Sequence, residues 1–123
     1  MRIVMILVLT TVLGGCTRLA MDSHLNGAYQ SYARGDCDQV MLQLSKVERE
    51  SRARRYVQPE VSMLRGQCLE RQKLYVDAAQ TYQFIMAQYP YSEYAYRARA
   101  RLDTLDQLGY LRGSPAVSKP ASL

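Results

Sequence analysis

Apolar residues recur every three or four positions along most of this 123-residue chain, the spacing that gathers side chains on one face of an α-helix. No stretch alternates between apolar and polar residues as a half-buried strand does. Gly35, Pro59 and Pro90 lie where one periodic segment ends or the next begins. The spacing therefore predicts an all-α protein with about five short antiparallel helices in residues 22–108.

Each predicted helix has one apolar stripe that we expect to form the core. The stripes are Leu25, Ala28, Tyr29 and Tyr32; Val40, Leu44 and Val47; Val61, Leu64 and Cys68; Ala78, Tyr82, Ile85, Met86 and Tyr89; and Tyr91, Ala95, Ala98, Leu102 and Leu105. Residues 109–123 have little apolar content and hold Gly113, Pro115 and Pro120. This composition predicts a disordered C-terminal tail.

The N-terminus has the pattern of a secretory signal peptide. Arg2 precedes an uncharged stretch over residues 3–15, which as a helix would be only ~20 Å long, too short for a ~30 Å hydrocarbon core. The stretch ends in Leu13-Gly14-Gly15-Cys16. This ending resembles the lipobox of bacterial lipoproteins, in which an aliphatic residue and two small residues precede the lipidated cysteine. An ordinary signal peptide and a buried apolar helix are the alternatives.

The lipobox resemblance implies a membrane-anchored protein. Residues 1–15 would be removed, Cys16 would carry a diacylglycerol and an acyl chain, and residues 16–21 would link the lipid to the domain. Two or more acyl chains give stable anchoring. Thr17, not Asp, follows the cysteine. By resemblance to Gram-negative lipoproteins, this absence of an inner-membrane retention signal favours the periplasmic face of the outer membrane. No other cofactor is expected.

Two cysteines remain after Cys16, namely Cys37 and Cys68. In an oxidising compartment an even pair favours a structural disulfide. Two free buried thiols, or a pair with a functional role, are the alternatives. A zinc site is disfavoured because the chain has one histidine, His24, and no closely spaced cysteine pair.

An internal repeat is visible in the second half of the chain. Gly66, Ala78, Tyr82, Ile85 and Pro90 follow one another at intervals of 12, 4, 3 and 5 residues. These intervals match the small and bulky positions at which the two helices of a tetratricopeptide-repeat unit close on each other. A weaker copy lies 38 residues upstream, where the usual period is 34, and consists of Ala28, Gly35, Val40, Leu44 and Val47.

Residues 78–95 resemble the repeats of one group within this family, which includes the outer-membrane β-barrel assembly lipoprotein and the periplasmic cell-division coordinator. The resemblance implies a short tetratricopeptide-like solenoid over residues 22–108, with residues 91–108 as the first helix of a third, capping unit. In such a solenoid Cys37 and Cys68 would come close enough to bond. Arg65 replaces the usual leucine, and the first copy lacks the closing proline. An unrelated small helical bundle is the alternative.

No pattern of catalytic residues accompanies the helices. The chain has no glycine-rich phosphate loop, no cluster of metal ligands and no nucleophile elbow. His24 stands alone and is expected to be an exposed helix residue. We therefore expect no enzymatic activity and no catalytic residue. The net charge is +5, from 16 basic and 11 acidic residues. Nucleic acid is not an expected partner in the periplasm.

Arginines and tyrosines supply the candidate binding residues. Arg49, Arg52 and Arg55 would share a helix face if the second helix extended that far, and Arg97 and Arg101 share a face of the last helix. Such faces are either merely solvated or bind acidic protein surfaces or lipid phosphates. Exposed tyrosine beside arginine is typical of interface hot spots, whereas core packing or capping would account for other tyrosines. The predicted partner-binding residues are Tyr91, Tyr94, Tyr96, Arg97, Arg52 and Arg55.

These observations favour an interaction scaffold. We expect an outer-membrane lipoprotein whose helical domain binds another envelope protein during assembly of secretion, pilus or outer-membrane machinery. The alternatives are a regulatory lipoprotein that modulates a cell-wall enzyme or envelope sensor, and a peptidoglycan or polysaccharide binder. With about two and a half repeats, the domain is near the lower limit for independent stability, so a second copy of the chain is a further expected partner.

Overall fold

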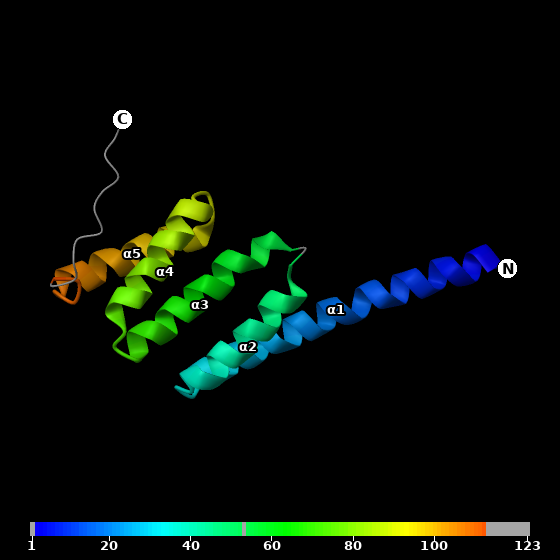
Figure 1. Cartoon of the computed structure of the whole chain (residues 1–123), viewed down its shortest axis with the longest axis horizontal. Helices are drawn as coiled ribbons and strands as arrows, with labels where there is room; N and C mark the ends of the chain where they lie inside the picture. Colours follow the sequence, from blue (N-terminus) through cyan, green and yellow to red (C-terminus); the bar gives the residue numbers. More distant parts are fainter. Residues whose placement is uncertain (1, 53, 113–123) are drawn as a thin grey trace.

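The computed structural model of the chain describes the backbone of residues 2–52 and 54–112 and the side chains of residues 18–52 and 54–112. This part of the chain has no β-strand, which confirms the predicted all-α class. Its elements are α1 (Arg2–Ala33), α2 (Cys37–Glu50), the short 3-10 helix η1 (Arg55–Val57), α3 (Gln58–Arg71), α4 (Tyr75–Gln88) and α5 (Glu93–Gln107) (Figure 1).

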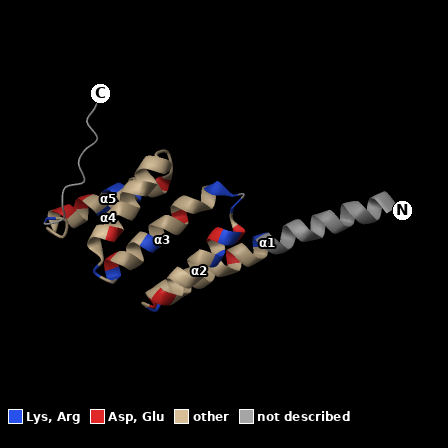
Figure 2. Cartoon of the chain, viewed as in Figure 1, with Lys and Arg blue, Asp and Glu red and all other residues tan. Residues whose placement is uncertain are grey.

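The five α-helices form two hairpins with α3 between them. Helices α1 and α2 pack together on one side of α3, and α4 and α5 pack together on the other (Figure 1). Helix α3 contacts α2, α4 and α5. Acidic and basic residues are interspersed along these helices, without separation by sign (Figure 2).

Helix α1 is longer than the sequence predicts. The expected first helix begins near Asp22, but α1 begins at Arg2 and continues through the expected linker, residues 16–21. The predicted removal of residues 1–15 and lipidation of Cys16 concern side chains that lie outside the described residues. Over the part of the chain that is described, no helix is long and apolar enough to span a membrane.

The predicted helix boundaries have clear local causes. The Asp36 side chain caps α2 by accepting a hydrogen bond from the Gln39 N–H at 3.1 Å. Ser92 caps α5 in the same way, through the Ala95 N–H at 3.1 Å. Before α2, Gly35 has a positive φ of 80°, which suits glycine because it has no Cβ. Pro59 lies in the first turn of α3, where the missing N–H costs no helical hydrogen bond.

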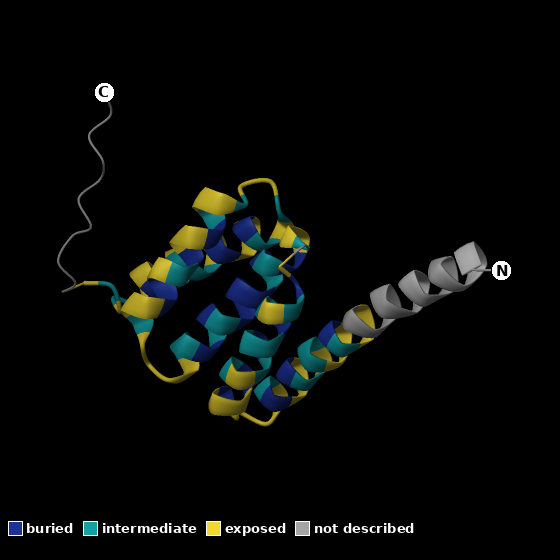
Figure 3. Ribbon diagram, turned by 45° about the vertical axis from the view of Figure 1, so that its right-hand side comes forward, coloured by how far each residue is buried: buried dark blue, intermediate teal, exposed yellow. Residues whose placement is uncertain are grey.

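The core consists of two clusters, one on each side of α3. Figure 3 shows the buried residues along the sides of the helices that face one another. The first cluster joins α1, α2, η1 and α3 and is formed by Met21, Ala28, Cys37, Val40, Leu44, Val47, Val57, Val61, Leu64 and Cys68. The second joins α3, α4 and α5 and is formed by Met63, Ala78, Tyr82, Ile85, Ala95, Ala98 and Leu105.

Most of the predicted core stripes are confirmed by these clusters, with three exceptions. Tyr91 is fully exposed, because α5 begins only at Glu93 and leaves Tyr91 in the preceding loop. Tyr89 is half-buried but belongs to neither cluster, and its ring packs against exposed Phe84. Tyr29 is 41% exposed, and its hydroxyl bonds to Glu60 of α3.

The predicted C-terminal tail starts later than Gly109. The Tyr110 ring stacks on Tyr75 with centroids 4.0 Å apart, and Leu111 packs against the second cluster. Residues 109–112 therefore belong to the folded domain. Residues 113–123, the rest of the predicted tail, lie outside the described residues.

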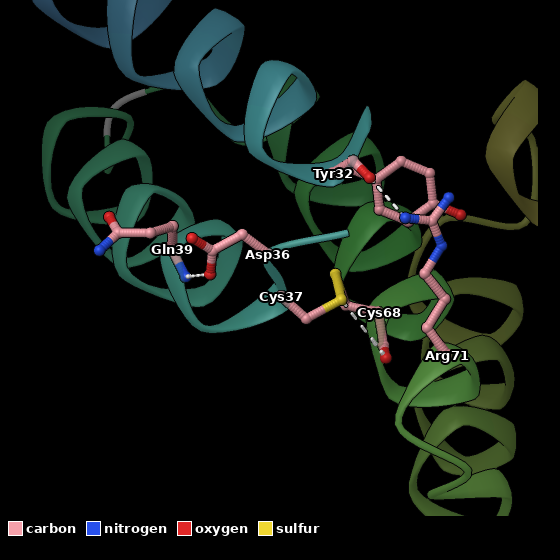
Figure 4. The surroundings of a disulfide bond; sticks show 6 residues. All are labelled: Tyr32, Asp36, Cys37, Gln39, Cys68 and Arg71. Atoms are coloured by element: carbon pink, nitrogen blue, oxygen red, sulfur yellow. Dashed lines mark hydrogen bonds between the residues drawn. A yellow bond between two sulfur atoms is a disulfide. The ribbon is translucent and has the colours of Figure 1, made fainter. Parts of the chain in front are cut away.

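A disulfide joins Cys37, the first residue of α2, to Cys68 in α3, with Cα atoms 5.5 Å apart (Figure 4). The structural pairing predicted from the cysteine count is therefore confirmed. Closing a loop over a sequence separation of 31 residues stabilises a domain by about 3–4 kcal/mol, through the lower chain entropy of the unfolded state. The bond fixes the first hairpin to the central helix.

Helices α3 and α4 approach closely at Gly66. A Cβ placed on Gly66 would lie 2.5 Å from Cε1 of Tyr82, whose side chain is fully buried. Only glycine leaves room for this ring. Gly27 in α1 differs, because a Cβ there would meet the Gln43 side chain at an ordinary 3.6 Å.

We expect Gly66→Ala to destabilise the protein, although alanine favours helix by ~1 kcal/mol over glycine. Displacement of the Tyr82 ring should lower the free energy of unfolding by about 1–3 kcal/mol, as overpacking does in other cores. Gly27→Ala is the control and should be neutral or stabilise by up to ~1 kcal/mol. Urea denaturation measures both. Equal effects of the two substitutions would contradict the close approach at Gly66.

Candidate partner-binding face

Helices α1, α3 and α5 contribute side chains to one common surface, which we call the inner face. On α3 the contributing residues follow the first of them by 7, 10 and 11 positions, which places them on one side of a helix. The inner face consists of Tyr29 and Tyr32 from α1; Glu60, Gln67, Glu70 and Arg71 from α3; and Tyr94, Arg97 and Arg101 from α5.

At one end of the inner face, α1 reaches α3 through a tyrosine. The Tyr29 hydroxyl donates a hydrogen bond of 2.6 Å to the Glu60 carboxylate. Burial, and then this hydrogen bond, raise the pKa of Tyr29 above its usual range; Tyr94 and Arg97 also act on this pKa, so they lie nearby. The Arg97 guanidinium lies 5.3 Å from the centre of the Tyr94 ring and 3.6 Å from Glu93.

At the other end lies a hollow of about 400 Å³. The Arg71 guanidinium stacks 3.7 Å from the centre of the Tyr32 ring and donates a hydrogen bond to the Tyr32 carbonyl (Figure 4). The hollow is lined by Tyr32, Gln67, Glu70, Arg71, Tyr75, Arg101, Leu105, Leu108 and Tyr110. Aromatic, apolar and cationic groups thus meet in one concave site, a combination suited to binding a protein segment.

The floor of this hollow is held by a hydrogen-bonded network on Glu70. Its carboxylate accepts a bond of 2.5 Å from the Tyr82 hydroxyl and two bonds from the Arg101 guanidinium, the first at 2.9 Å. Burial alone would raise the pKa of Glu70, but the bonds from Arg101 and Tyr82 outweigh burial and lower this pKa. The network therefore stays charged at neutral pH and fixes α5 against α3.

Of the predicted partner-binding residues, Tyr94 and Arg97 lie on the inner face. Tyr96 of α5 and Tyr91 in the preceding loop lie elsewhere. They line a separate hollow of about 260 Å³ with Met86, Pro90, Ser92, Ala95 and Arg99. Tyr96 is 81% exposed there.

The predicted arginine face on the second helix is absent. Helix α2 ends at Glu50 with Ser51 as its cap, so Arg52 and Arg55 lie beyond it and share no helix face with Arg49. Both side chains are exposed. Arg101 was expected to share a face with Arg97; it does lie on the inner face, but its guanidinium is bound to Glu70.

His24 also differs from the expectation of an exposed, isolated residue. It is part-buried between α1 and α2, with Nδ1 2.9 Å from the Gln43 amide oxygen and Nε2 3.5 Å from Glu50. Within the described part of the chain, His, Cys, Asp and Glu side chains form no group of three that could hold a metal ion.

The sequence analysis does not identify six residues of the inner face: Tyr29, Tyr32, Glu60, Gln67, Glu70 and Arg71. Both tyrosines belong to a predicted core stripe, because a stripe at helical spacing does not say on which edge a residue becomes exposed. Glu60 and Arg71 come together with α1 only through the tertiary fold, so no local pattern reveals them.

Comparison with family models, with curated proteins and with solved structures finds no match for this chain.

We expect Glu70→Gln to remove an acid-sensitive part of the stability. Because folding lowers the pKa of Glu70, its contribution is present above the ordinary glutamate pKa of ~4.3 and is lost as the pH falls below that value. At pH 7 the free energy of unfolding of the variant should be about 1–2 kcal/mol lower than that of the wild type, because a hydrogen bond to a charged group is weakened.

Urea denaturation at pH 7 and at pH 3 checks this expectation, since the difference between wild type and variant should shrink in acid. Glu93→Gln is the control: its exposed pair with Arg97 should contribute under ~0.5 kcal/mol at either pH. A difference at Glu70 that does not change with pH would contradict the role of its charge.

Proposed function

We propose that this protein is a lipid-anchored scaffold of the bacterial envelope whose helical domain binds a segment of another protein. The observation that carries the proposal is the inner face, where three alternate helices present tyrosines and arginines around a hollow of about 400 Å³. Interfaces are enriched in these residue types because they combine a large contact area with directed hydrogen bonds.

The proposed tetratricopeptide-like arrangement is supported by the packing. Gly66, Ala78, Tyr82 and Ile85, which carry the repeat spacing, lie where α3 meets α4. A core cluster on each side of α3 fits stacked helical units, each of which buries its apolar residues against the next. In this arrangement α1, α3 and α5 are the first helices of successive units and together form the binding surface.

The proposed location rests on the N-terminal sequence and on the cysteines. Leu13-Gly14-Gly15-Cys16 supports lipidation, and Thr17 favours the outer membrane by resemblance. The bond between Cys37 and Cys68 suits an oxidising compartment such as the periplasm. Acyl chains would hold the domain at the membrane surface while its inner face stays open to a partner.

We expect Cys16→Ser to release the protein from the membrane fraction or to leave it as the unprocessed precursor, because serine cannot accept the thioether-linked diacylglycerol. Fractionation of a Gram-negative host, with metabolic labelling by a fatty acid, measures both effects. Cys37→Ala/Cys68→Ala is the control and should keep its lipid label. Equal labelling of the Cys16→Ser variant would contradict the proposed anchor.

The inner face is tested by photocrosslinking in cells, with a photoreactive amino acid placed at one position at a time. Arg97 and Tyr96 form a matched pair, because they are consecutive and exposed but point to different sides of α5. We expect protein adducts at position 97 to exceed those at position 96 and at Gln83, an exposed residue of α4, by at least fivefold.

Stronger adducts at position 96 would move the binding site to the hollow beside Tyr91 and contradict the inner face. An absence of adducts at all three positions would contradict a binding function for this surface. Mass spectrometry of the adduct identifies the partner.

A further inference from the structure

We propose that the inner face selects a peptide segment by two opposite charges, an acidic side chain bound at Arg71 and a basic side chain bound at Glu60. This inference rests on the proposed function and specifies the chemistry of the ligand. It follows from which charges on the inner face already have a partner within the domain.

Two of the ion pairs on or beside the inner face are internal. Arg101 binds Glu70, and Arg97 lies 3.6 Å from Glu93. Among the described residues, neither Glu60 nor Arg71 has an oppositely charged group within 4.0 Å. Glu60 and Arg71 therefore each lack an ion-pair partner in direct contact, although Asp36 and Asp38 line a further hollow together with Arg71.

Neutral groups orient both of these charges without cancelling them. The Glu60 carboxylate accepts a hydrogen bond from the Tyr29 hydroxyl, and this tyrosine stays uncharged. The Arg71 guanidinium is held by the Tyr32 ring and the Tyr32 carbonyl. Each charged group thus lies beside a tyrosine side chain and can still form an ion pair with a ligand.

The separation of the two charges sets the spacing of the ligand. Glu60 and Arg71 lie in the first and last turns of α3, eleven residues apart, which corresponds to ~16 Å along the helix axis. An extended peptide covers that length in about five residues. Because Arg71 bends toward Tyr32 on α1, we expect the two ligand charges to be three to five residues apart.

Glu60 lies in the first turn of α3 and Arg71 in its last turn. An acidic group at the start of a helix and a basic group at its end stabilise the helix through its dipole, so substitutions here also change the stability of α3. Two residues at other helix ends are matched controls for this effect: Asp77 lies in the first turn of α4 and Arg49 in the last turn of α2. Both side chains are exposed, and neither lies on the inner face. Charge reversal at Asp77 or Arg49 therefore reproduces the effect on helix stability without altering the proposed ligand site.

The test is selection of random twelve-residue peptides, displayed on phage, on the full-length lipidated protein in detergent. On the wild type we expect peptides with one acidic and one basic residue three to five positions apart, at least fivefold more often than in the starting library. The Arg71→Glu variant should instead select two basic residues, and Glu60→Lys two acidic residues. Asp77→Lys and Arg49→Glu should select the same peptides as the wild type.

Binding of one wild-type-selected peptide then gives the size of the effect. Its Kd should rise about tenfold with Arg71→Gln or Glu60→Gln, and remain within about twofold with Asp77→Asn or Arg49→Gln. Circular dichroism of each variant confirms that the helices are retained.

Two outcomes overturn the inference in different ways. If selected peptides crosslink at position 97 but lack the charge pair, or keep it in both reversal variants, the charge selection is wrong and the proposed function stands. If no peptide is enriched above the detergent-only support, the proposed function is contradicted together with this inference.

Discussion

The close approach of α3 and α4 at Gly66 is the constraint on which the second half of the domain depends. The missing side chain admits the Tyr82 ring, which fills the centre of the second core cluster. From there the Tyr82 hydroxyl reaches Glu70 on α3, and Glu70 in turn binds Arg101 on α5. One small residue thus determines how three helices are held together, by packing on one side and by a charged network on the other.

Helix α3 serves both cores, and this explains where a binding surface can form. Its apolar residues are divided between the first cluster, through Val61, Leu64 and Cys68, and the second, through Met63. The remaining side of α3 carries Glu60, Gln67, Glu70 and Arg71 and lies between α1 and α5. A helix buried on two sides has a narrow polar strip left, and here that strip becomes the middle of the inner face.

The helices and most of the core follow from the sequence, because periodicity and capping are local properties. Val40, Leu44 and Val47 are buried as their spacing predicts, and Asp36 and Ser92 cap the helices that follow them. The binding surface is harder to predict, because it depends on which helices become neighbours. The spacing of Arg52 and Arg55 suits an extension of the second helix, but that helix ends at Glu50. Tyr91 fits the apolar stripe of the last helix, but the cap at Ser92 places it outside that helix. The sequence does not reveal that the Arg101 guanidinium is bound to Glu70, because these two residues are brought together only by the fold.

The position of the disulfide makes the two halves of the domain unequal in their resistance to local opening. Cys37 and Cys68 join α2 to α3, so α2 cannot separate from the central helix at this point without breaking a covalent bond. Helices α4 and α5 have no such link to α3 among the described residues, and are retained by Tyr82, Glu70 and the packing around them. We therefore expect fluctuations that expose backbone amides to be more frequent in the terminal hairpin. Of the helices that form the inner face, α3 is bonded covalently to its neighbour α2, whereas α5 is held by side-chain contacts alone.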